Sequence, residues 1–191
     1  SPAVAGHRPL TLALSVAAAF LAPNNLARAQ ASGLQAIHGS ASQTTQGNKT
    51  VITTQNGAGT SHSVLNWQSF SVPSGSITQF NQPSANSTAI NRVLGNNPSA
   101  IFGTLSSNGK LVLVNPAGIA VGAGAVVDTA GFTASTLRMT DADALAGRLV
   151  FGDGALAGGL SVNGHIVARG GDIVLIAPDV QTGAGAVMES P

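Results

Sequence analysis

The chain has 191 residues, of which 43% are hydrophobic and only 8% are charged. This balance disfavours an intrinsically disordered chain, and the net charge of +1 gives no sign of a basic surface for nucleic acid. Frequent glycine with few aromatic residues favours many short strands over helices, in one domain of ordinary size. The absence of cysteine agrees with a protein that crosses a membrane unfolded.

Residues 1–29 have the pattern of a secretory signal peptide. His7 and Arg8 form a weakly basic start, Leu10–Ala22 is a 13-residue apolar run, and Ala27–Ala29 has the small-x-small form of a cleavage site. A membrane span needs about 20 residues, so an anchor or a buried helix is the weaker alternative. Because the chain begins at Ser1 and not at Met, we expect further residues upstream.

Residues 30–60 are polar and predict an N-terminal cap. Val51–Thr54 is β-branched throughout and predicts a strand, and Asn56-Gly57 predicts a hairpin turn. A cap of this kind shields the first edge of a stack of strands.

Residues 61–191 alternate short apolar runs with turn signals and predict the coils of the stack. Leu65, Trp67 and Phe70 are the expected inward groups of the first run. The predicted strands are His62–Val72, Ser76–Phe80, Thr88–Val93, Leu111–Val114, Gly118–Val121, Ala125–Val127 and Phe132–Ser135, with a turn at Asp128–Gly131. One short helix is predicted at Thr140–Gly147, with a Thr cap, acidic residues in the first turn and a Gly stop.

The chain also repeats itself. Leu111–Pro116 resembles Ile173–Pro178, 62 positions later, and Gly122–Val126 returns as Gly183–Val187. An offset near 62 suggests three coils of roughly 20 residues. Leu105–Val112 further resembles Leu160–Val167. Chance similarity and a β-sandwich are the alternatives, but continuous apolar runs favour strands stacked in parallel.

Catalytic and ligand-binding patterns are missing from the sequence, so we expect no enzyme, no cofactor and no metal. The histidines His7, His38, His62 and His165 lack the local spacing of a metal site. Gly122-Ala123-Gly124 lacks the third glycine of a dinucleotide loop. A polysaccharide-cleaving β-helix would need clustered carboxylates, whereas Asp128, Asp153, Asp172 and Asp179 are isolated and fit turns.

Several motifs in one order resemble the secretion domain of two-partner secretion (TPS) exoproteins, the family of filamentous haemagglutinins, haemolysins and contact-dependent inhibition toxins. They are Phe80–Pro83, Ala89–Val93, Asn97–Gly103, Asn108–Ile119, Phe132–Leu137 and Asp141–Asp143. The family's hallmark is Asn-Pro-Asn-Gly-Ile. Here Asn115, Pro116, Gly118 and Ile119 match it, whereas Ala117 replaces the second Asn and removes one side-chain amide.

The resemblance implies an all-β fold, a right-handed parallel β-helix with an N-terminal cap and extra-helical strands. It also implies export to the periplasm by the general secretion machinery, and recognition by an outer-membrane β-barrel transporter with periplasmic docking domains. The product would be secreted or held on the bacterial surface, and residues 30–191 would be its targeting and folding-nucleation domain. We expect a longer exoprotein to continue beyond Pro191 and to carry an adhesin, haemolysin or toxin activity. The alternative is an adhesin module that binds host glycan or protein directly, for which Trp67 is the candidate aromatic contact.

Overall fold

Three sheets carry nearly all the regular structure of the computed structural model, which describes residues 30–191. The signal peptide predicted over residues 1–29 lies outside the described residues. The first sheet contains β1 (Gln35–His38), β4 (His62–Trp67), β6 (Thr88–Val93), β9 (Lys110–Val114), β12 (Gly131–Ser135) and β15 (Ile173–Ile176). The second contains β7 (Ser99–Ile101), β10 (Ile119–Val121), β13 (Leu160–Val162) and β16 (Val180–Thr182). The third contains β2 (Ser40–Gln46), β3 (Lys49–Gln55), β5 (Ile77–Asn81), β8 (Thr104–Ser107), β11 (Val126–Thr129), β14 (His165–Ala168) and β17 (Val187–Glu189).

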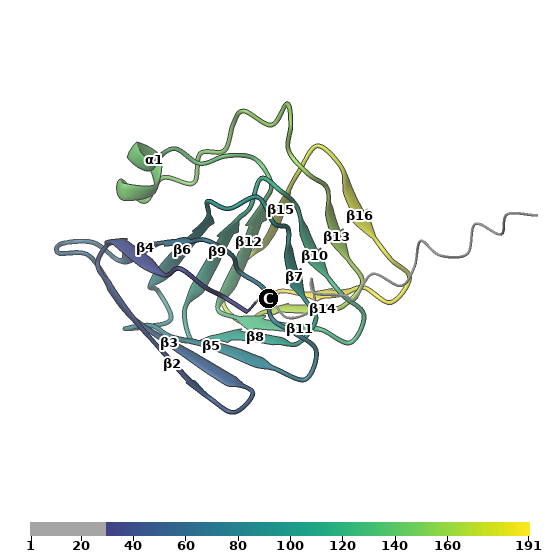
Figure 1. Cartoon of the computed structure of the whole chain (residues 1–191), viewed down its shortest axis with the longest axis horizontal. Helices are drawn as coiled ribbons and strands as arrows, with labels where there is room; N and C mark the ends of the chain where they lie inside the picture. The colour runs from purple at the N-terminus through teal and green to yellow at the C-terminus, as the bar shows by residue number, and fades with distance from the viewer. Residues whose placement is uncertain (1–29) are drawn as a thin grey trace, which may run out of the picture.

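The chain visits the three sheets in turn and so winds into a coil. After β9 in the first sheet it enters β10 in the second, β11 in the third and β12 beside β9 again (Figure 1). Strands of successive coils pair in parallel, as β6 does with β9 and β9 with β12. The predicted parallel β-helix is therefore confirmed.

Among the named strands of residues 30–191, antiparallel pairing is confined to the N-terminal end. There β2 pairs with β3 and β1 pairs with β4, at the end where we expected the cap. The hairpin between β2 and β3 turns at Gly47-Asn48, where Gly47 has φ 59°. The hairpin predicted at Asn56-Gly57 is wrong, because the turn there carries the chain from the third sheet to β4 in the first.

The repeat seen in the sequence corresponds to two coils and not to three. Leu111 pairs with Phe132 in the next coil, and Phe132 pairs with Ile173 in the coil after that. The second of these steps along the chain is longer than the first, because the chain leaves the coil between β12 and β13. The similarity of Leu105–Val112 to Leu160–Val167 does not reflect equivalent positions, since Leu105 lies in the third sheet and Leu160 in the second.

The segment that leaves the coil contains the predicted helix, α1 (Asp141–Leu145). The Thr140 side chain accepts a hydrogen bond from the Asp143 amide at 3.1 Å, and Gly147 takes a positive φ of 69° just past the end. We call residues 136–159 the excursion; Figure 1 shows it standing out beside the first sheet. Within residues 30–191, no helix has the length and apolar character that crossing a bilayer requires.

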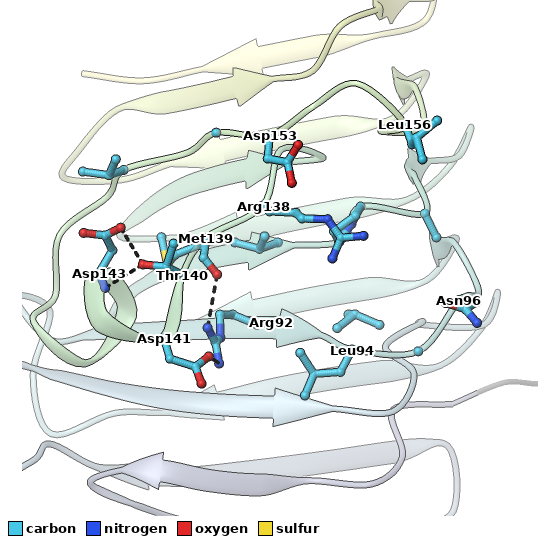
Figure 2. Close-up of a pocket in the computed structure, with 17 residues that line it drawn as sticks. Arg92, Leu94, Asn96, Arg138, Met139, Thr140, Asp141, Asp143, Asp153 and Leu156 are labelled. Carbon is cyan, nitrogen blue, oxygen red and sulfur yellow. Dashed lines mark hydrogen bonds and ion pairs between the residues drawn. The ribbon is translucent and has the colours of Figure 1, made fainter.

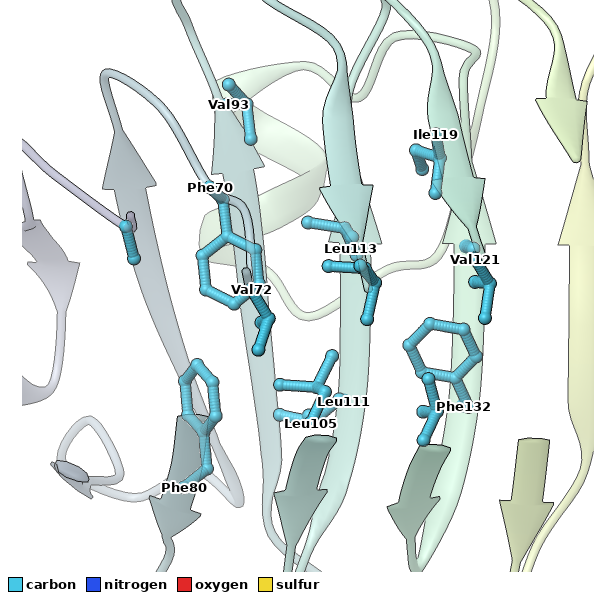
Figure 3. Close-up of a cluster of buried hydrophobic side chains, with 14 of the residues drawn as sticks. Phe70, Val72, Phe80, Val93, Leu105, Leu111, Leu113, Ile119, Val121 and Phe132 are labelled. Atoms are coloured by element: carbon cyan, nitrogen blue, oxygen red, sulfur yellow. The ribbon is translucent and has the colours of Figure 1, made fainter. Parts of the chain in front are cut away.

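A narrow column of apolar side chains fills the inside of the coil (Figure 3). Its largest members are Trp67, Phe70, Phe80 and Phe132, each at most 2% exposed, and burying one such side chain contributes roughly 1.5–3 kcal/mol. Leu65, Trp67 and Phe70 therefore point inward as predicted. Because Trp67 is buried and its indole N–H donates to Asn91 at 3.0 Å, it cannot be the exposed aromatic of an adhesin groove.

The predicted turn at Asp128–Gly131 begins too early. Asp128 and Thr129 continue β11, and the chain turns at Ala130. Within β11 the carboxylate of Asp128 makes a two-pronged ion pair with Arg169, at 2.6 and 2.7 Å. The Arg169 hydrogen bond also lowers the pKa of Asp128. Turn chemistry therefore does not explain this residue.

Candidate functional site

The matched motif forms one corner of the coil, where the chain passes from β9 to β10. Asn115 is 0% exposed, and its side chain makes three hydrogen bonds. The amide nitrogen donates to the Asn97 carbonyl at 3.0 Å and to the Ser99 hydroxyl at 2.9 Å. Its oxygen accepts from the Ala117 amide at 3.0 Å. Asn115 thus closes its own turn and ties it to the preceding coil.

The rest of the motif completes the turn and starts the next strand. The Gly118 amide donates to the Asn115 carbonyl at 3.0 Å, and Gly118 has φ 127°, which side-chain-bearing residues rarely adopt. Ile119 begins β10 and is 2% exposed. Only Pro116 and Ala117 are partly accessible. The four predicted site residues are therefore neighbours, but the motif is largely internal.

A pocket of about 720 Å³ opens beside this corner, and Pro116 and Ala117 form part of its wall. Its other walls come from the end of β6, the loop that follows β6, and the excursion. Figure 2 shows how side chains from these segments surround it. Sequence reasoning missed this pocket, because its walls meet only when successive coils stack.

A buried arginine holds the excursion against the first sheet. Arg92 is 4% exposed, and its guanidinium forms an ion pair with Asp141 at 2.6 Å. It also donates to the Met139 carbonyl at 3.2 Å and to the Asn66 side-chain oxygen at 3.0 and 3.1 Å. Arg92 belongs to the Ala89–Val93 motif. That motif therefore has a structural role, because its arginine fixes the part of the excursion that lines the pocket.

The carboxylate of Asp143 is engaged at the start of α1. The Thr140 hydroxyl donates to it at 2.6 Å and Arg148 forms an ion pair with it at 2.7 Å. The Thr140 hydrogen bond, followed by that of Arg148, lowers the pKa of Asp143. Asp143 is therefore a helix-capping anion and is unsuited to act as a general base near neutral pH.

Two other charged side chains of the pocket form no ion pair among residues 30–191. They are Arg138, whose backbone pairs with Gly152, and Asp153, which has a left-handed φ of 54°. In Figure 2 the Arg138 side chain extends across the pocket between Asp153 and Leu94. The wall of the pocket thus carries one exposed guanidinium and one exposed carboxylate that form no ion pair among the described residues.

The fold brings together two histidines that the sequence places 24 positions apart. The rings of His38 and His62 stack with centroids 4.5 Å apart. His62 donates to the Leu145 carbonyl at 3.0 Å, and His38 lies 3.0 Å from the Thr60 hydroxyl. The antiparallel pairing of β1 with β4 creates this contact. In the described part of the chain, no three His, Cys, Asp or Glu side chains gather in a way that could hold a metal ion.

Comparison with known proteins gives one family. The sequence profile described as the TPS secretion domain matches residues 27–189. A crystal structure of the HMW1 secretion domain from Haemophilus influenzae superposes with a TM-score of 0.73 and 32% identity, covering 80% of this chain and 40% of that one.

Two curated relatives carry the same name. A heme/hemopexin-binding protein of Haemophilus influenzae is 39% identical over 104 residues, which is 54% of this chain and 11% of that protein. A second protein of that name from the same species is 38% identical over 78 residues, 41% of this chain and 8% of that protein. The chain thus spans about a tenth of the length of these relatives.

Proposed function

The chain belongs to the family of TPS secretion domains, which are non-catalytic targeting domains, and on that premise we propose that it delivers a larger exported protein to an outer-membrane β-barrel transporter. The transporter would bind it through periplasmic docking domains. Residues 1–29 would first direct the chain through the general secretion machinery. Residues 30–60 would then cap the coil and residues 61–191 would form its body.

The observation that carries this proposal is the match of residues 27–189 to the secretion-domain family. The parallel coil supplies a physical reason. Each new coil buries its apolar face on the coil before it, so folding can advance stepwise as the chain emerges from the transporter. A domain that folds first gives later coils a template, which is the folding-nucleation role.

We assign the motif residues Asn115, Pro116, Gly118 and Ile119 to this function as the builders of one corner. The burial of Asn115 and its three hydrogen bonds support a role in shaping the turn. A transporter that binds the folded domain would then meet the corner through Pro116 and Ala117, its accessible part.

Binding of the purified chain to the purified periplasmic region of its cognate transporter tests the proposal. We expect saturable binding, and we expect no binding to the periplasmic region of an unrelated transporter. The competing function, direct adhesion to a host glycan or protein, is tested in parallel on a glycan array and on host-cell surfaces. Binding there without binding to the transporter would replace the targeting function with the adhesive one.

A further inference from the structure

The N-terminal cap covers the first coil but leaves one long strand edge of its own open. Strand β2 is the terminal strand of the third sheet, and within residues 30–191 it pairs with β3 alone. Figure 1 shows it as the outermost strand of the cap. Every second N–H and C=O of such a strand points away from the sheet and is free to pair with another chain. The cap therefore ends in a template for one further strand.

The edges of the other two sheets at this end of the coil are protected. In the first sheet, β1 has only four residues, and its register with β4 shifts between Ala36 and His38. In the second sheet, a bridge from Val72 to Ile101 covers β7, and Pro73, which has no backbone N–H, follows directly. Short, irregular and proline-bearing edges are devices by which proteins avoid pairing with other chains.

Strand β2 carries none of these devices. Its seven residues pair with β3 in one unbroken register, from Ser40 opposite Gln55 to Gln46 opposite Lys49. Its sequence, SASQTTQ, contains no charged residue and no proline, and every side chain except that of Ala41 is exposed. A long, regular and uncharged edge is the kind to which a strand of another chain adds.

The side chains of β2 indicate which strand fits this edge. Serine, threonine and glutamine both donate and accept hydrogen bonds, so the strand is complementary to a copy of itself. Antiparallel pairing about a two-fold axis at Gln43 would place the two copies of Gln43 opposite each other and Ser42 opposite Thr44. The one charged residue in the hairpin sequence 40–55 is Lys49. Its two copies would lie roughly 20 Å apart, beyond the ends of the paired strands, so no like charges would meet.

We propose that two copies of the folded domain pair through β2, in an antiparallel contact with two-fold symmetry that joins their third sheets edge to edge. The two coils would meet at their N-terminal ends, and their C-terminal ends would point away from each other. Because both copies use the same edge, the pairing closes at two copies. An edge of seven residues buries little area, so the dimer is reversible, with a dissociation constant between about 1 μM and about 1 mM. The dimer is a property of the folded domain and is independent of how the transporter recognises the chain.

Sedimentation of the purified chain over a range of concentrations tests the proposal. Gln43 is exposed, and Gln43→Lys or Gln43→Glu would place like charges opposite each other at the two-fold axis. Each variant alone should therefore dimerise about tenfold more weakly than the unaltered chain. An equimolar mixture of the two variants should restore the dimer as a mixed pair, because opposite charges then face each other. Loss of fold in either variant could not produce this rescue.

Two lysine substitutions elsewhere in the third sheet are matched controls. Gln55 is exposed on β3, one strand in from the edge, and Val187 is exposed on β17, the opposite edge of the same sheet. Gln55→Lys and Val187→Lys should each dimerise within about twofold of the unaltered chain, since neither side chain lies on the pairing strand.

A cross-link gives a second, independent readout. The chain has no cysteine, so Gln43→Cys introduces a single thiol. Across an antiparallel pair the two Cβ atoms at the axis lie about 4.5–5.5 Å apart, close to the spacing of a disulfide. Mild oxidation should therefore join two chains of Gln43→Cys, and it should leave Gln55→Cys as single chains.

Three results would overturn the proposed dimer. The first is a chain that stays monomeric up to about 1 mM. The second is a dimer that Gln43→Lys and Gln43→Glu leave unchanged. The third is a dimer that Val187→Lys abolishes and Gln43→Lys does not, which would place the contact at the C-terminal end of the coil. Transporter-dependent export of Gln43→Lys is measured separately and should equal that of the unaltered chain, so a failure of the dimer and a failure of the targeting function are distinguishable.

Discussion

Replacing Asn115 with alanine should destabilise the domain while leaving the export of its folded molecules unchanged. The substitution removes three side-chain hydrogen bonds and leaves the Asn97 carbonyl, the Ser99 hydroxyl and the Ala117 amide without that partner. At about 1 kcal/mol for each bond, the free energy of unfolding should fall by about 3 kcal/mol. For a domain of this size, this lowers the melting temperature by about 6–12 °C.

Denaturant unfolding followed by circular dichroism measures the change in stability. Asn97→Ala is the matched control, because the Asn97 side chain is exposed and only its backbone carbonyl contacts Asn115. It should shift the unfolding free energy by no more than about 0.5 kcal/mol. If Asn115→Ala is as stable as the control, the structural reasoning is refuted. If the folded molecules of Asn115→Ala are exported less well than the unaltered chain, the transporter recognises the Asn115 side chain itself.

Three further predictions concern the anchor of the excursion, the turn glycines and the ion pair between Asp128 and Arg169. Arg92→Ala should lower the free energy of unfolding by about 3 kcal/mol, because it removes a buried guanidinium that pairs with Asp141. It should also speed amide hydrogen exchange in the excursion. Unchanged exchange there would contradict the anchoring role of Arg92. Gly118→Ala, at φ 127°, should lower the free energy of unfolding by about 2 kcal/mol. Gly124→Ala, at φ 79° with open space where its Cβ would lie, should lower it by about 1 kcal/mol. If thermal melting finds Gly124→Ala to be the more destabilised of the two, the turn geometry is contradicted. Arg169→Met should destabilise the protein at pH 7, and its difference in unfolding free energy from the unaltered chain should shrink steadily as the pH falls below about 3.9. This follows because Arg169 depresses the folded-state pKa of Asp128, so the stabilisation exists above the unfolded pKa near 3.9 and disappears as the pH falls through the lowered value. If the stability difference between Arg169→Met and the unaltered chain does not change with pH, the ion pair does not stabilise the fold as stated.

The local pattern of the sequence predicted the strands of the central coil well. Thr88–Val93 matches β6 at both ends, and Thr140 caps α1 as expected. These elements depend on β-branched runs, turn residues and capping residues, which act over a few positions. The resemblance to TPS secretion domains supplied the coil architecture that links them.

Contacts between coils could not be predicted in the same way. The step along the chain from Leu111 to its partner Phe132 is much shorter than the step from Phe132 to its partner Ile173, so a fixed repeat length does not tell which residues stack. The pairing of Arg92 with Asp141, of Asp128 with Arg169 and of His38 with His62 depends on the length of each step. The pocket has the same origin, because the excursion closes over the first sheet only once the coil has formed.

Export across the outer membrane tests the account most directly. The chain is produced in bacterial cells with its cognate transporter, and its amount in the medium and in the periplasm is measured against cells that lack the transporter. We predict that it reaches the medium only when the transporter is present and collects in the periplasm otherwise. Equal amounts in the medium with and without the transporter would contradict the assignment of this domain to transporter-dependent secretion.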